Sequence, residues 1–211
     1  MPQPIVTQTS HTPAAQHDEH ILVVKRDDFF AQEAAWHGCK EANFDAYLRL
    51  IQEKKEFLPR SQMEVNPAYK QIIPYLIFTH NDTLFLMQRT AQATESRLQN
   101  KYSLGIGGHI REEDLVSGSL FEWARREFNE EVEYNDDFSI EPLGILNDDS
   151  NAVGAVHVGF VFLLKGSTNA IKVKSELKSG ILLTQEECKS FYNSMESWSQ
   201  MVFNFMVNRV E

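Results

Sequence analysis

Apolar positions in the first quarter of the chain follow two spacings, one typical of strands and one typical of helices. The run ILVVK, which begins at Ile21, is typical of a strand. After Asn43, large apolar side chains recur at i, i+3, i+4 and i+7, which predicts an amphipathic helix with Asn43 as its N-cap. The helical positions are Phe44, Tyr47, Leu48 and Ile51.

The middle of the chain carries the pattern of a hairpin. The apolar runs at 71–80 and 83–89 flank Asn81 and Asp82, a pair of residues that favours a tight turn. Pro74 lies inside the first run, and proline cannot donate a hydrogen bond to a neighbouring strand. We therefore expect an antiparallel pair with Pro74 at the edge of the sheet.

Strand and helix patterns alternate in the remainder. Strands are predicted at 101–106, 140–146 and 156–164, and a helix at 119–132. Thr184 and Glu187 form a capping box that opens a further helix, and helical spacing extends from Trp198 to the end. The fold class is therefore α/β, a mixed sheet covered by helices.

Length and composition set the domain organisation. The chain has 211 residues, which favours one domain at 21–211. Residues 1–20 contain almost no large apolar side chains and are expected to form a loose tail.

Charge and cysteine content narrow the function classes. The net charge of −10 disfavours nucleic acid as a partner. Only Cys39 and Cys188 are present, far apart and without metal-ligand spacing, which argues against a disulfide scaffold and a zinc site. No apolar run is long enough to span a bilayer, and the first 20 residues lack a signal-peptide core. We expect a soluble cytoplasmic protein with no membrane partner.

The most informative segment is the predicted helix at 119–132. On a helical wheel, Glu127 and Glu131 fall among the apolar residues, and Glu130 lies at the border of that sector. Two carboxylates one turn apart on a buried face require compensation. Three convergent carboxylates suit Mg²⁺ or Mn²⁺, which commonly share their ligands with substrate phosphates. The alternative is a set of surface ion pairs between Arg126 and the glutamates at Glu122 and Glu130.

Gly108 and the run REFNEE at 126–131 resemble the Nudix box, Gly-x5-Glu-x7-Arg-Glu-U-x-Glu-Glu-x-Gly-U, in which U is bulky and apolar. The RExxEE half matches fully. Arg126 lies 18 positions after Gly108, where the pattern places 14, so about four residues are inserted. The position of the first Glu of the box is ambiguous: counting forward from Gly108 gives Asp114, counting back from Arg126 gives Gly118, and Glu122 could instead supply the partner of Arg126. Glu133 replaces the second Gly.

The resemblance extends to KQIIPYLIF, RLQNKYSLGIGGHI and GILNDDSNAVGAVHVGFVF, as in a bacterial subgroup of uncharacterised phosphoesterase-like Nudix proteins. It implies a Nudix-type α/β/α sandwich with a mixed β-sheet, with a core at 70–205 and an N-terminal strand and helix extension at 21–66. By resemblance, the metal ligands are Gly107, Glu127, Glu130 and Glu131, and Arg126 orients the glutamates.

The implied activity is metal-dependent hydrolysis of the diphosphate linkage in a nucleoside diphosphate joined to a moiety X. The cofactor is Mg²⁺ or Mn²⁺, the partner is a small-molecule nucleoside diphosphate derivative, and a homodimer is compatible with the family. The general base is open among Glu131, Glu187 and Glu196.

Several basic residues are candidates for phosphate binding, against the alternative of plain surface positions. They are Arg89, Arg97, Lys101 and His109. His157 opens an apolar strand, where a satisfied core histidine is the favoured interpretation.

Two other functions are consistent with the box. A non-hydrolytic Nudix-fold sensor of nucleotide ligands is suggested by the lengthened loop. A Nudix-fold isomerase would need a cysteine in the site, and neither Cys39 nor Cys188 is near the box in sequence.

Overall fold

The computed structural model describes residues 18–90, 99–115, 120–174 and 177–209. The first part contains the strands and helices β1 (His20–Lys25), α1 (Arg26–Phe29), β2 (Gly38–Lys40), α2 (Phe44–Lys54), β3 (Glu56–Pro59), α3 (Arg60–Met63), β4 (Tyr69–His80), β5 (Thr83–Arg89), β6 (Tyr102–Ser103) and β7 (Gly105–Gly107).

The second part begins with a short 3₁₀ helix at Glu112–Leu115. It continues with α4 (Leu120–Glu131), β8 (Val132–Glu133), β9 (Phe138–Asn147), α5 (Ala152–Val156), β10 (His157–Gly166), β11 (Lys172–Val173), β12 (Leu177–Thr184), α6 (Gln185–Lys189), a 3₁₀ turn at Tyr192–Ser194, and α7 (Ser197–Asn208).

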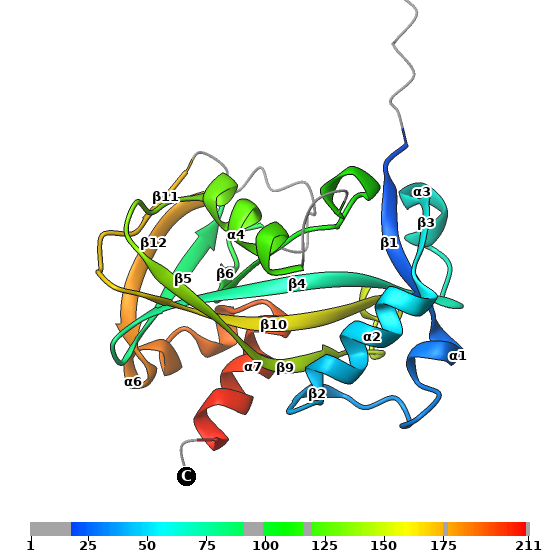
Figure 1. The fold of residues 1–211 in the computed structure, drawn as a ribbon. Helices are drawn as coiled ribbons and strands as arrows, with labels where there is room; N and C mark the ends of the chain where they lie inside the picture. The colour runs from blue at the N-terminus through cyan, green and yellow to red at the C-terminus, as the bar shows by residue number, and fades with distance from the viewer. Residues whose placement is uncertain (1–17, 91–98, 116–119, 175–176, 210–211) are drawn as a thin grey trace, which may run out of the picture.

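A mixed sheet is the central layer, with the strand order β12-β5-β4-β10-β9-β2 (Figure 1). β4 and β10 are parallel neighbours, whereas β4–β5 and β9–β10 are antiparallel. β1 and β7 pair with different parts of β4. The predicted α/β class with a mixed sheet is confirmed.

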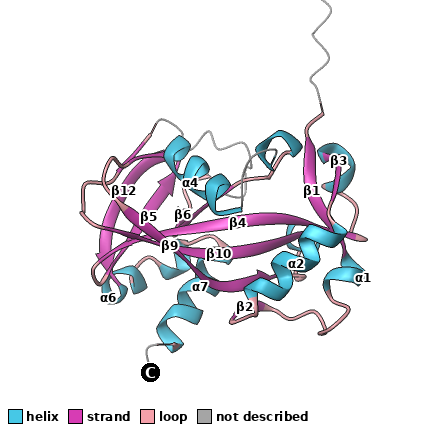
Figure 2. Ribbon diagram, in the orientation of Figure 1, coloured by secondary structure: helices cyan, strands magenta, loops and turns pink. Residues whose placement is uncertain are grey.

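Both faces of the sheet are covered. Alternate side chains of β4 enter two different cores, because successive residues of a strand point to opposite faces. Leu76 and Phe78 pack with α2 and α4, while Tyr75 and Ile77 pack with α6 and α7. Figure 2 shows α4 on one side of β4 and β10, and α6 and α7 on the other. This is the α/β/α sandwich that the resemblance implies.

Several local predictions hold. Asn43 caps α2 by accepting a hydrogen bond from the Ala46 amide, and Thr184 and Glu187 form the capping box of α6. β4 and β5 form the expected hairpin, with Asn81 at φ 51° in its turn. The strand expected at 101–106 is two short strands, β6 and β7.

The edge position predicted from Pro74 is wrong. β4 lies inside the sheet, and Pro74 pairs in register with Phe160 of β10. On its other side, β4 pairs with β1 only up to Gln71 and with β7 only from Tyr75. Pro74 lies in the gap between these two partners, where the lack of an N–H donor costs no ladder hydrogen bond.

The sequence interpretation missed β3, α3 and β12, and the tail boundary is slightly displaced. His20 already belongs to β1, and Asp18 accepts hydrogen bonds from Ser61. Residues 1–17 of the expected tail lie outside the described residues. Among the described residues, no helix is long and apolar enough to cross a membrane.

The packing of α4 on the sheet sets the position of the box glutamates. Phe128 is fully buried, and its ring stacks on Phe78 of β4 with a centroid distance of 5.7 Å and an interplanar angle of 10°. Phe128 also contacts Tyr134 and Phe138. One aromatic cluster therefore anchors the C-terminal half of α4.

We expect Phe128→Ala to lower the free energy of unfolding by about 3–5 kcal/mol, because it removes a buried ring and leaves a cavity. Val65→Ala is the control, since Val65 is 79% exposed and its truncation should change stability by less than about 0.5 kcal/mol. Urea denaturation of the three proteins measures both effects. Equal midpoints for Phe128→Ala and the wild type would contradict this anchoring.

Candidate active site

The glycine turn after β7 and the helix α4 are in direct contact. A Cβ atom added to Gly108 would lie 2.4 Å from Oε1 of Glu127, closer than any real contact of that kind. A side chain at position 108 would therefore displace the Glu127 carboxylate, and glycine leaves room for it. The contact brings the two halves of the box pattern, Gly108 and RExxEE, together in space.

The burial of the α4 side chains agrees with their predicted positions on the helical wheel. Trp123, Ala124 and Phe128 are buried, Arg126 and Glu130 are exposed, and Glu127 and Glu131 are intermediate.

The carboxylates of α4 repel one another. Burial and, to a smaller extent, the neighbouring charges of Glu130 and Glu131 together raise the pKa of Glu127 to about 7. A partly buried carboxylate beside two others favours the protonated state unless a cation is present. This cluster of carboxylate oxygens next to a glycine turn is therefore a donor set that fits a hard divalent cation such as Mg²⁺.

Asp114, one of the candidates for the first Glu of the box, contacts Arg126. Its Oδ1 lies 2.7 Å from Nη2 of Arg126, and its Oδ2 accepts hydrogen bonds from the Arg111 amide and the Trp123 indole. Gly118, an alternative, lies outside the described residues, and Glu122 is exposed. The partner of Arg126 thus comes from the loop. Arg126 also pairs with Glu130 at 3.5 Å, so the surface ion pair weighed as an alternative is present alongside.

A cavity of about 130 Å³ opens beside the glycine turn. Gly107, Tyr75 and His157 line one part of it, and Arg89, Glu196 and Trp198 line another. Nε of Arg89 donates to Oε1 of Glu196 at 2.9 Å. The pair comes from β5 and from the start of α7, which are distant in sequence.

The charge of Arg89 is secured by its surroundings. Burial alone would lower the pKa of Arg89, but Glu196, and more weakly Glu131, raise it above its usual value. Ser103 donates a further hydrogen bond to Glu196 at 3.3 Å.

The other predicted residues fall in different places. Arg97 lies outside the described residues. The carbonyl of Lys101 accepts from the Arg89 amide, and Lys101 is not among the residues that line the cavity. Glu187 accepts hydrogen bonds from Thr184 in the exposed cap of α6, so the fold does not bring it to the box.

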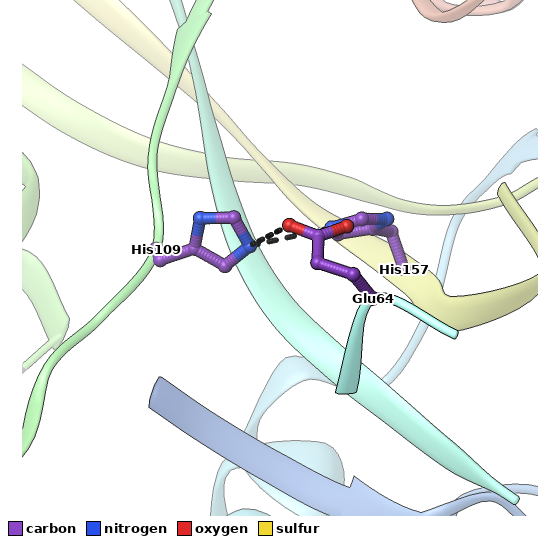
Figure 3. Close-up of side chains that lie close together, drawn as sticks. All are labelled: Glu64, His109 and His157. Atoms are coloured by element: carbon purple, nitrogen blue, oxygen red, sulfur yellow. Dashed lines mark hydrogen bonds and ion pairs between the residues drawn. The ribbon is translucent and has the colours of Figure 1, made fainter. Parts of the chain in front are cut away.

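His109 lies in a polar cluster with His157 and Glu64 (Figure 3). Its Nε2 lies 2.6 Å from Oε1 of Gln71, 3.3 Å from Nε2 of His157 and 3.8 Å from Oε1 of Glu64. Burial, together with the charges of Arg60 and His157, lowers the pKa of His109 to about 3. Glu64 and Gln71 were missed by sequence reasoning, because no local motif connects them to His109.

One wall of the cavity is held by a buried lysine that the sequence did not single out. Lys70 is fully buried, and its Nζ donates to Asp149 at 2.8 Å and to the carbonyls of Gly154 and His157. Asp149 also accepts from Arg26 at 2.6 Å. These contacts fix the loop before α5, whose residues border the cavity.

Comparisons with known proteins agree with this geometry. No family model matches the chain. It is 35% identical over 205 residues to Protein YmaB of Bacillus subtilis (strain 168), across 90% of this chain and 98% of YmaB. It is 32% identical to the solved structure of Tm1382, a "putative Nudix hydrolase", with a TM-score of 0.77 and coverage of 90% of this chain and 99% of Tm1382.

The chain belongs to the Nudix family. The Nudix domain of Shewanella oneidensis NrtR, solved with ADP ribose, has a TM-score of 0.53 at 14% identity and covers 67% of this chain and 89% of that domain. That likeness concerns the fold. The evidence for family membership is therefore the similarity to Tm1382, and the contact between Gly108 and Glu127 agrees with it.

The stabilising role of Asp114 has a defined pH dependence. Burial alone would raise its pKa, but hydrogen bonds from Arg111 and the charges of Arg111 and Arg126 lower it below its usual value. The ionised carboxylate therefore stabilises the fold above the pKa of the unfolded state, and this stabilisation is lost as pH falls through the folded pKa.

We expect Asp114→Asn to lower the free energy of unfolding by about 1–3 kcal/mol at pH 7, because buried hydrogen bonds to a charge are lost. The difference from the wild type should shrink progressively below about pH 4. Urea titrations between pH 3 and pH 8 test this, with the exposed Glu53→Gln as control. A difference that is independent of pH would contradict the assignment.

Proposed function

We propose that this Nudix protein is a pyrophosphohydrolase that requires a divalent cation and cleaves the diphosphate linkage of a nucleoside diphosphate derivative. The observation that carries the proposal is the contact of the Glu127 carboxylate with Gly108, next to the carboxylates of Glu130 and Glu131. Such a set of oxygens is unfavourable without a cation and well suited to one.

The backbone carbonyl of Gly107 and the carboxylates of Glu127, Glu130 and Glu131 would hold Mg²⁺ or Mn²⁺. When bound, the cation supplies Lewis-acid polarisation of phosphate oxygens and lowers the pKa of a water molecule. Arg126, paired with Asp114, holds α4 against the loop and so sets the position of the glutamates.

Arg89 is the proposed phosphate-binding residue. It lines the cavity beside Gly107, remains charged, and is held in one orientation by Glu196. A guanidinium matches the geometry of phosphate oxygens and neutralises charge that develops during cleavage. His109 is directed to the cluster with His157, so a contact with phosphate is not supported for it.

Two carboxylates are proposed to accept a proton from the attacking water, namely Glu131 on the box helix and Glu196, which pairs with Arg89. The loss of Glu131 would remove a metal ligand as well as a base. The loss of Glu196 would release Arg89 and leave the metal ligands intact. The two variants are therefore distinguishable by their metal dependence.

We expect Glu131→Gln to lower kcat by at least about 100-fold, because it removes a charged metal ligand from the reacting centre. The measurement is phosphate release across a panel of nucleoside diphosphate derivatives with Mg²⁺, Mn²⁺ or EDTA. Glu133→Gln is the matched control, since Glu133 is exposed on β8 only two residues away.

Glu196→Gln should raise KM, because it disorders the proposed phosphate-binding Arg89, and a large additional fall in kcat would assign the proton acceptor to Glu196 rather than Glu131. Hydrolysis that persists in EDTA, or full activity of both Glu130→Gln and Glu131→Gln, would contradict the proposal.

A second candidate is a Nudix-fold binding protein that recognises a nucleotide ligand without cleaving it. The four residues inserted between Asp114 and Arg126 favour it, because they lengthen the loop that carries the partner of Arg126. Recovery of intact ligand after binding would support this candidate. An isomerase that uses a cysteine is not supported, because neither Cys39 nor Cys188 lines the cavity and burial raises the pKa of both thiols.

A further inference from the structure

Three metal-ligating side chains from distant parts of the chain converge beside the cavity (Figure 3). Glu64 follows α3, His109 follows the glycine turn, and His157 begins β10. One potential ligand atom of each lies within 4.8 Å of the others. None of them belongs to the carboxylate set of α4.

The hydrogen bonds of His157 direct a lone pair into this cluster. Its Nδ1 lies 2.7 Å from the carbonyl oxygen of Val153, which can only accept, so Nδ1 carries the proton. In the neutral ring, Nε2 then has the lone pair, and it points towards Nε2 of His109. A backbone carbonyl that fixes the tautomer in this way is typical of histidines that bind metals.

Gln71 borders the cluster and fixes the second imidazole. Its side chain is fully buried, and its amide oxygen lies 2.6 Å from Nε2 of His109. Because that oxygen can only accept, Nε2 of His109 carries the proton in the absence of a metal.

The spacing of the ligand atoms suits a tetrahedral metal. Metal–nitrogen bonds of about 2.0–2.1 Å at a tetrahedral angle place two nitrogens about 3.3 Å apart. The Nε2 atoms of His109 and His157 are 3.3 Å apart. Oε1 of Glu64 is 3.8 Å from Nε2 of His109, and its partly exposed side chain has room to move towards the two imidazoles. Arg60 donates to that carboxylate at 3.1 Å and orients it.

We propose that Glu64, His109 and His157 form a second metal site, separate from the Nudix box, that binds Zn²⁺ or a similar transition metal ion. Two imidazoles and one carboxylate select such ions over Mg²⁺, which prefers oxygen ligands. On binding, the proton of His109 shifts from Nε2 to Nδ1, and both Nε2 atoms become ligands. The proposal does not depend on hydrolysis at the box.

The site would connect two parts of the molecule. Glu64 belongs to the N-terminal segment at 21–66, whereas His109 directly follows Gly108, and His157 lines the cavity. A metal held by all three would fix the N-terminal segment to the sheet and hold the backbone next to the glycine turn. Binding to the folded state alone should therefore raise the melting temperature.

The test is Zn²⁺ titration of the full chain by calorimetry in the presence of excess Mg²⁺, which occupies the carboxylates of α4. We expect one equivalent of Zn²⁺ per chain and a Zn²⁺-dependent rise in melting temperature. Both should be lost in His109→Gln and His157→Gln. Glu64→Gln, which changes a half-exposed side chain and so preserves the fold, should weaken Zn²⁺ binding at least about tenfold.

Two control variants separate this site from other metal binding. His20→Ala removes an exposed histidine of β1 and should leave the stoichiometry at one. Glu130→Gln alters the box, and Zn²⁺ binding should survive even where phosphate release is lost. Loss of hydrolysis and loss of Zn²⁺ binding are thus measured independently.

Cobalt provides a spectroscopic check. Co²⁺ bound in place of Zn²⁺ should show the visible bands of a tetrahedral site with nitrogen ligands, and these bands should be absent in folded Glu64→Gln or His157→Gln protein. Zn²⁺ binding that is equally strong in the wild type, Glu64→Gln and His157→Gln would overturn the proposal. So would the absence of Zn²⁺ binding above the Mg²⁺ background, in which case the histidines form only a hydrogen-bonded pair.

Discussion

The contact between the Glu127 carboxylate and the bare backbone of Gly108 is the constraint on which the rest of the site depends. It combines a glycine in the turn after β7, a helix packed on the sheet, and a carboxylate that is partly buried. Stacking of Phe128 on Phe78 sets the depth of the helix, and Asp114 holds Arg126 at its exposed side. The resulting cluster of like charges is unfavourable by itself, so a bound cation would stabilise it.

The cavity beside the glycine turn adds a positively charged side chain that suits a phosphate-containing substrate. Arg89, which lines the cavity together with Gly107, is held by Glu196 from a different part of the chain. Gly107 adjoins Gly108, which meets the Glu127 carboxylate, so the guanidinium in the cavity lies on the same glycine turn as the box helix, an arrangement that suits a diphosphate with a bound cation. Lys70 pairs with Asp149 and donates to the carbonyl of Gly154, and these contacts stabilise the part of the cavity that the residues of α5 line.

Local patterns in the sequence predicted much of the fold. Helical spacing located α2, α4 and α7, and the burial of α4 followed its wheel, because amphipathic helices bury the face that their apolar residues define. The failures were tertiary. Pro74 suggested an edge, yet a gap between β1 and β7 accommodates it within the sheet. The partner of Arg126 was ambiguous because it lies across an insertion. Glu64, Gln71 and His157 have no local signal at all, since only the fold brings them to His109.

The central claim is that the glycine turn and the glutamates of α4 hold a divalent cation. Anomalous scattering from crystals soaked in Mn²⁺ tests it most directly, because it locates the ion without relying on activity. The account predicts a peak within bonding distance of the Glu127 and Glu131 carboxylates and the Gly107 carbonyl. A well-ordered α4 with no peak there, at a Mn²⁺ concentration that labels other sites, would contradict it.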